Sequence, residues 1–178
     1  KAHVNMMRHK DFCMFSGIFM IGKVEVLDNL PTACTNGRDV AYGRAFVESL
    51  DDQQLSFVVL HEAMHKSYRH LSVWKHIAKT DQFLVNMAMD YVINLEITDL
   101  DKSETVVAMP RDADGEIIGC LDERFRGMDT KQVYDILKKE QRRNGGDKGQ
   151  DDGSSDCPND GDFGFDTHDW EGARSLSD

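Results

Sequence analysis

Two histidines and a glutamate are the residues of this sequence whose types and spacing most directly suggest chemistry. They form the pattern His61-Glu62-Ala63-Met64-His65. Residues four apart lie one above the other on an α-helix, so His61 and His65 would share one face and could hold a single metal ion, with Glu62 beside it. Two imidazoles and a carboxylate suit Zn²⁺, which is bound tetrahedrally and in catalytic sites keeps one position for water. The pattern therefore predicts a zinc site that uses His61 and His65.

Long helices are predicted to position these residues. Ser49-Leu50-Asp51-Asp52 is typical of a helix start, because a small polar cap and early acidic residues are favoured there. The first helix should run over 52–70, with the apolar run 57–60 burying it just before His61. After a short helix over 72–79, a second long helix is predicted over 81–97. Its inward stripe is Phe83, Leu84, Met87, Tyr91 and Leu95.

The third zinc ligand is expected to come from this second long helix. Asp90 and Asn94 lie four apart, on or beside its apolar stripe, where unpaired polar groups are costly. Asp90 is the preferred ligand, and Asn94 suits an outer position that holds a zinc histidine by its other ring nitrogen. Two alternatives stay open. His70 would point about 140° away from His65 on an unbroken helix, and His168 follows much later in the chain.

The predicted chemistry is hydrolysis of peptide bonds in a peptide or protein substrate. With zinc bound, water would lose a proton near neutral pH, Glu62 would accept it, and the hydroxide would attack a carbonyl polarised by the metal. Glu62 and His168 are therefore the predicted catalytic residues. His168 is one of three candidates for stabilising the oxyanion, together with Tyr91 and Arg44.

Short strands are predicted around the helices. Residues 12–28 are rich in β-branched and aromatic side chains and should form one or two antiparallel strands. An Asn36-Gly37 turn leads into an extended piece over 40–46, in which Gly43 would allow the close approach of another backbone. This piece could be an edge strand that binds an extended substrate. The predicted class is α+β and zincin-like, with a small, mainly antiparallel N-terminal sheet packed on the two long helices.

Composition limits the other classes of function. The chain has 178 residues and a net charge of −11, which argues against a nucleic-acid partner. No apolar run approaches a membrane span, and the N-terminus lacks the pattern of a secretion signal, so we expect a soluble, cytoplasmic protein. Cys13, Cys34, Cys120 and Cys157 form no CxxC pair and are expected to be free thiols.

The composition changes sharply after residue 143. Residues 1–143 are predicted to form the zincin-like domain, and residues 144–178 an acidic arm rich in glycine and aspartate. The arm ends in the segment Thr167-His168-Asp169-Trp170. This segment could fold back over the active site, and the arm could bind an assembly partner.

The sequence resembles a family of metallopeptidase-like domains of bacteria and phages that often precede a von Willebrand A-like domain. The resemblance rests on four segments, namely TNGRDVAYGRAF (35–46), LHEAMH with His70, AMDYVIN (88–94) and THDW (167–170). It implies a zincin-like fold, a zinc site with His61, His65 and Asp90, and a catalytic Glu62. The alternative hypothesis is a structural or assembly protein, possibly phage-associated, that keeps the fold and the metal site but cleaves nothing.

Overall fold

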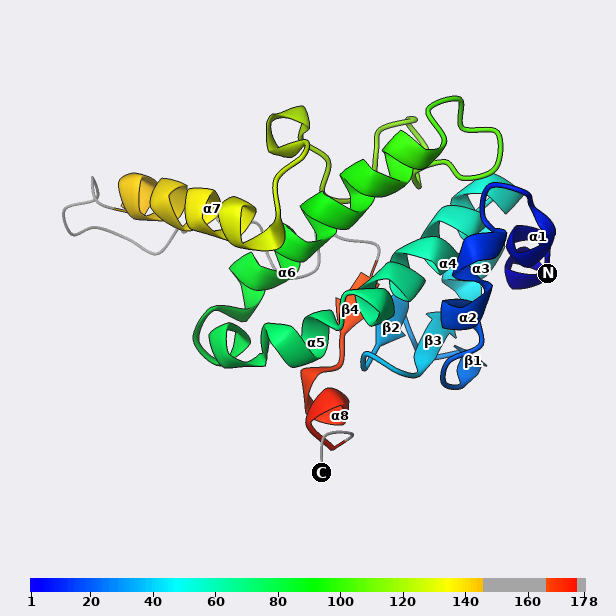
Figure 1. Cartoon of the computed structure of the whole chain (residues 1–178), viewed down its shortest axis with the longest axis horizontal. Coiled ribbons are helices and arrows are strands. Elements are labelled where there is room, and N and C mark those ends of the chain that lie inside the picture. Colours follow the sequence, from blue (N-terminus) through cyan, green and yellow to red (C-terminus); the bar gives the residue numbers. More distant parts are fainter. Residues whose placement is uncertain (146–165, 176–178) are drawn as a thin grey trace.

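A computed structural model describes residues 1–145 and 166–175 of the chain (Figure 1). In chain order its elements are α1 (Ala2–Arg8), the 3₁₀ helix η1 (Cys13–Phe15), α2 (Ser16–Phe19), β1 (Val24–Leu27), β2 (Ala33–Thr35), β3 (Val40–Gly43), α3 (Arg44–Ser49), α4 (Asp52–Ser67), α5 (His70–Val73), α6 (Lys75–Leu100), η2 (Glu123–Phe125), α7 (Thr130–Gly145), β4 (Asp166–His168) and α8 (Trp170–Ser175). The α+β class is confirmed.

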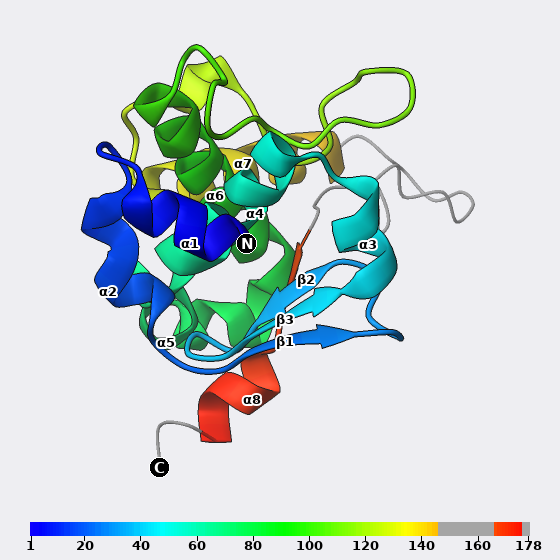
Figure 2. The same cartoon turned by 90° about the vertical axis from the view of Figure 1, so that its right-hand side faces the viewer.

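The four strands form one sheet in the order β1-β3-β2-β4. β2 and β3 pair antiparallel around the predicted Asn36-Gly37 turn, whereas β1 pairs parallel with β3, and β4 parallel with β2. The prediction of a mainly antiparallel N-terminal sheet is therefore wrong. β2 runs opposite to β3 and lies between β1 and β3 in the sequence, so the chain returns in the direction of β1 when it forms β3, and β4 comes from a much later part of the sequence. Figure 2 shows β1, β3 and β2 side by side.

Two of the strand predictions are wrong for identifiable reasons. Residues 13–19 form η1 and α2, and within 12–28 only Val24–Leu27 is a strand. Phe12, Phe15 and Phe19 recur at the helical spacings of three and four, a period that outweighs their β propensity. The segment 40–46 is not an edge strand either, because β3 is paired on both sides and α3 begins at Arg44. The close approach expected at Gly43 is confirmed, since an added Cβ would lie 2.1 Å from the Leu30 carbonyl oxygen.

The helix α4 begins as predicted and ends earlier. Asp51 and Gln54 form a capping box at its start. Its last residue is Ser67 rather than residue 70, because Arg69 adopts the left-handed conformation with φ of 53° and starts a new direction for α5. The predicted helix over 72–79 covers the end of α5 and the start of α6, and the one over 81–97 lies within α6, which contains a non-helical Asp81.

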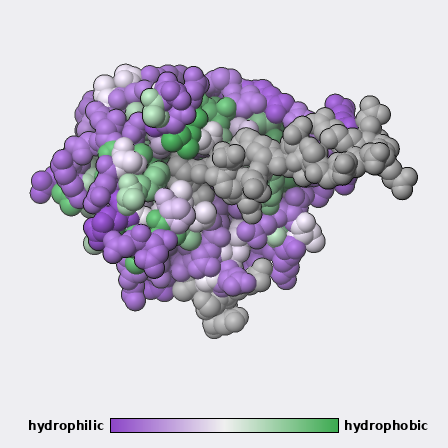
Figure 3. All heavy atoms as spheres, turned by 180° about the vertical axis from the view of Figure 1, so that it is seen from behind, coloured by the Kyte–Doolittle hydropathy of each residue, from purple (hydrophilic) through white to green (hydrophobic). Residues whose placement is uncertain are grey.

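The core consists of two groups of buried side chains. One group joins α4 to the N-terminal helices and the sheet, and includes Phe57, Leu60 and Ala33. The other joins α6 to α7 and reaches Trp170 of α8. The surface seen from behind is mostly hydrophilic, with smaller apolar areas (Figure 3). Among the described residues, each helix is too short or too polar to cross a membrane.

Candidate metal centre

The helix α4 supplies three side chains to a buried polar cluster. His61, Glu62 and His65 are each 0% exposed. His61 and His65 lie one turn apart, and their Nε2 atoms are 3.0 Å from each other. The capping box fixes the start of α4, and the apolar side chains before His61 pack the helix against the sheet, so both imidazoles project from a rigid element.

Asp90 of α6 completes a group of three possible metal ligands. Its Oδ1 lies 3.3 Å from Nε2 of His65 and 3.8 Å from Nε2 of His61. In a tetrahedral zinc site with bonds of about 2.0–2.1 Å, neighbouring ligand atoms are roughly 3.3–3.4 Å apart. The three separations of 3.0, 3.3 and 3.8 Å bracket this value. The described residues include this one group of three whose donor atoms all lie within 4.8 Å of one another.

Asn94 determines which nitrogen of His61 faces the group. The Asn94 side-chain NH₂ donates to the Cys120 carbonyl at 2.9 Å, which leaves its Oδ1 as the acceptor for His61 Nδ1 at 2.8 Å. His61 must therefore carry its proton on Nδ1, and its Nε2 presents a lone pair toward His65 and Asp90. This is the tautomer that a metal ligand requires, and the structure brings Asn94 to the outer position expected from the sequence.

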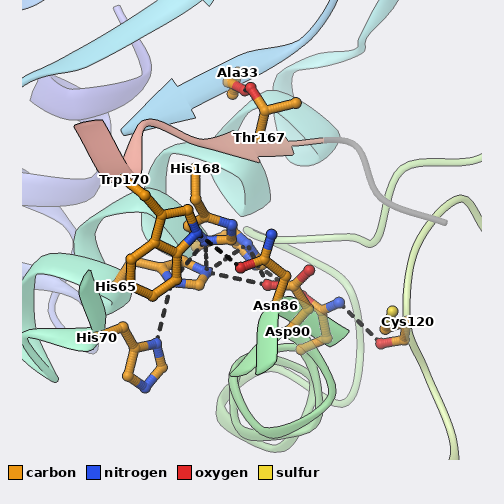
Figure 4. Close-up of polar contacts among 11 residues, drawn as sticks. Ala33, His65, His70, Asn86, Asp90, Cys120, Thr167, His168 and Trp170 are labelled. Carbon is orange, nitrogen blue, oxygen red and sulfur yellow. Dashed lines mark hydrogen bonds and ion pairs between the residues drawn. The ribbon is translucent and has the colours of Figure 1, made fainter. Parts of the chain in front are cut away.

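His70 contacts His65 from the opposite side. Its Nδ1 lies 3.1 Å from Nδ1 of His65, so the other nitrogen of His65 faces the possible ligands (Figure 4). The expectation that His70 points elsewhere assumed an unbroken helix, and the left-handed Arg69 removes that assumption. Burial and the nearby His168 and His61 lower the pKa of His70 to about 3. A neutral His70 can therefore accept a hydrogen bond from His65 and orient it.

His168 reaches the same cluster from β4. Its Nε2 lies 3.1 Å from Nδ1 and 3.3 Å from Nε2 of His65. Figure 4 shows His168 pointing from β4 toward His65, while Thr167 points to the other side of the strand. The other two oxyanion candidates lie in different surroundings, since Arg44 is exposed and donates to Asp28, and the Tyr91 ring packs against Phe125.

The carboxylate of Glu62 influences two residues that the sequence interpretation did not select. Burial, followed by the charge of Glu62, raises the pKa of Tyr42 well above its usual value. Burial lowers the pKa of Lys66, although the negative charges of Glu62 and Asp39 oppose this change. His65 itself is completely buried, and this burial first, and then the nearby His168, His61 and His70, lower its pKa well below 6.5. A neutral His65 is the form that can bind a metal.

Comparison with known families identifies the class of protein. The chain matches the family described as "Putative metallopeptidase domain" over residues 1–174, and it belongs to this family. The match includes the whole donor group on α4 and α6 as well as β4. No curated protein and no solved structure matches the chain.

Proposed function

We propose that this chain is a zinc-dependent peptidase with a zincin-like fold. His61, His65 and Asp90 would hold the ion, and Glu62 would act as general base. The observation that supports the proposal best is the convergence of three suitable donors, with the lone pair of His61 Nε2 directed at the group through Asn94. Two imidazoles and one carboxylate are a donor set that catalytic zinc sites use.

The metal and the residues of the chain would each perform part of the reaction. Bound Zn²⁺ would lower the pKa of water to about 7 and polarise the substrate carbonyl. Glu62 follows the ligand His61 directly, so its carboxylate is suited to take the proton of the attacking water and to return it to the leaving amine. Among the three oxyanion candidates, His168 is the one in contact with a ligand histidine, and the metal would stabilise the oxyanion in any state in which His168 has moved away.

Two substitutions test the assignment. The wild-type protein should contain one zinc per chain by elemental analysis and should cleave a peptide library. His61→Ala should abolish zinc binding, and Glu62→Gln should keep the zinc but abolish cleavage. His76→Ala and Glu48→Gln are matched controls, because both residues are exposed and lie on other helices. Full hydrolytic activity in Glu62→Gln would contradict the role of Glu62 as base.

The second candidate is a structural or assembly protein that keeps the metal. Complete burial of His61 and His65 favours it, since structural zinc sites are closed to solvent. In that case zinc is bound, no peptide is cleaved, and Glu62→Gln behaves as the wild type. Three expectations stay predictions. They are the docking of an assembly partner by the acidic arm, the domain division after residue 143 and the cytoplasmic location. Residues 146–165 of that arm lie outside the described residues.

A further inference from the structure

The proposed active site is covered by a short C-terminal segment of the chain. We define the latch as β4 and α8, residues 166–175. We propose that the latch occupies the binding edge for an extended peptide substrate, and that it must leave β2 before a substrate can enter. This inference rests on the proposed function and adds a substrate class and a means of control to it.

Burial of the proposed reacting groups requires some element to move. His61, Glu62 and His65 are 0% exposed, and Asp90 is 7% exposed. A substrate carbonyl must reach within bonding distance of the metal and within hydrogen-bond distance of Glu62. The closed arrangement therefore fits a resting state, and the question is which neighbouring element opens.

The latch is anchored over fewer residues than the two helices that carry the ligands. β4 pairs with β2 over only three residues, and α8 is a single short helix. α4 and α6, by contrast, carry 16 and 26 residues and form the centres of the two buried groups. Elements with few buried contacts open at the lowest free-energy cost. The latch is therefore more readily released than α4 or α6.

Specific polar contacts hold the latch in place. The Asp169 amide donates to the Thr35 carbonyl at 2.9 Å, and the Thr167 hydroxyl donates to the Ala33 carbonyl at 3.2 Å. Trp170 is 4% exposed, and its indole N–H donates to Asn86 Oδ1 at 3.2 Å. These contacts, together with His168 against His65, close the site from the side of the sheet (Figure 4).

Release of the latch would expose the main chain of β2. Extended peptides bind to such sheet edges by adding a strand, whose main-chain hydrogen bonds do not depend on the peptide sequence. In the present register His168 lies opposite Thr35, and from this position its side chain reaches His65. A peptide that took the place of β4 in this register would lie directly beside the ligand histidines. The inferred substrate is therefore an extended, unfolded peptide segment rather than a folded surface.

A natural cysteine allows the latch to be locked reversibly. Cys34 of β2 lies opposite Thr167 of β4. Figure 4 shows Thr167 pointing away from the ligands, and because directly paired residues of neighbouring strands share one face of a sheet, Cys34 lies on that face too. Paired residues of adjacent strands are about 5 Å apart, which is within the range that a disulfide spans. Thr167→Cys should therefore form a bond with Cys34 on oxidation, and a thiol reductant should break it.

The test compares the oxidised and reduced forms of the zinc-loaded Thr167→Cys protein. Oxidation should slow zinc transfer to an excess chromophoric chelator by at least about ten-fold, because the ion leaves through the opened latch. It should also abolish cleavage of an unfolded casein substrate, and reduction should restore both rates. The control carries Cys34→Ser with Thr167→Cys and cannot form the bond. Equal zinc-transfer rates in the oxidised and reduced forms would overturn the proposal.

Two further measurements separate this inference from the proposed function. Amide hydrogen exchange of the metal-free protein should be much faster for the latch than for α4, and equal protection would overturn the latch even if no zinc binds. Asn86→Ala removes a latch contact outside the donor group, and it should speed both zinc transfer and peptide cleavage.

Discussion

Replacing Asn94 should weaken zinc binding although Asn94 would not touch the ion. Asn94 is 1% exposed and makes two hydrogen bonds, one from His61 Nδ1 at 2.8 Å and one to the Cys120 carbonyl at 2.9 Å. Loss of an outer partner of a ligand histidine typically costs 10–100-fold in metal affinity, which corresponds to about 1.4–2.8 kcal/mol. Asn94→Ala should therefore raise the dissociation constant for zinc by one to two orders of magnitude.

The two hydrogen bonds can be separated by a second substitution. Asn94→Asp keeps an acceptor for His61 but removes the donor to the Cys120 carbonyl. It should bind zinc at least as tightly as the wild type, because a carboxylate increases the basicity of the histidine. The metal-free form of Asn94→Asp should nevertheless be destabilised by about 1–3 kcal/mol, since a buried carbonyl loses its partner.

Competition with a chromophoric chelator measures the zinc affinity, and urea unfolding of the metal-free proteins measures stability. Thr98→Ala is the matched control, because Thr98 lies one turn further along α6 and its hydroxyl donates to the Leu95 carbonyl of its own helix. This control should change zinc affinity by less than about two-fold. If Asn94→Ala bound zinc as tightly as the wild type, the argument that Asn94 sets the tautomer of His61 would fail.

Three more predictions follow from other contacts. Asp90→Asn should weaken zinc binding by more than the roughly 100-fold limit for an outer partner, and equal affinities for Asp90→Asn and Asn94→Ala in the same competition assay would remove Asp90 from the ligand set. His3 has a pKa lowered first by burial and then by Lys66 and the N-terminus, so the unfolded chain takes up a proton that the folded chain resists. The free energy of unfolding should therefore keep its full value above about pH 6.5 and should decrease as the pH drops below it. Urea unfolding between pH 8 and 5 should show a smaller decrease in His3→Gln than in the wild type, and a His76→Gln control should behave as the wild type. Gly43→Ala should destabilise the protein by about 1–3 kcal/mol, because the new Cβ would collide with the Leu30 carbonyl, and an unchanged urea midpoint would show that this backbone contact is relaxed at little cost.

Helical periodicity allowed part of the candidate site to be predicted from the sequence. The four-residue spacing of His61 and His65, and that of Asp90 and Asn94, are properties of one helix each. A buried carboxylate needs a partner, which is why Asp90 could be connected to the histidines across a long interval of sequence. The structure brings these four residues together as expected.

The remaining parts of the centre depend on the tertiary structure. The contact between His70 and His65 follows from one left-handed residue, Arg69, which no helical pattern indicates. The effect of Glu62 on Tyr42 depends on where β3 lies in the sheet. These relations are set by backbone conformation and packing between elements, so the local residue pattern alone does not contain them.

By itself, the sequence determined the residues of the proposed metal site, the helices that carry them and the α+β class, because side-chain chemistry and helical spacing are local. Only the tertiary structure decided the strand order, the parallel pairing of β4 with β2 and the closure of the site by the latch. The Thr167 hydroxyl meets the Ala33 carbonyl across 134 positions of sequence. Such a pairing forms only when the free energy gained by packing the whole fold exceeds the entropy lost in closing the long loop between the two residues. No single segment of the sequence determines this balance.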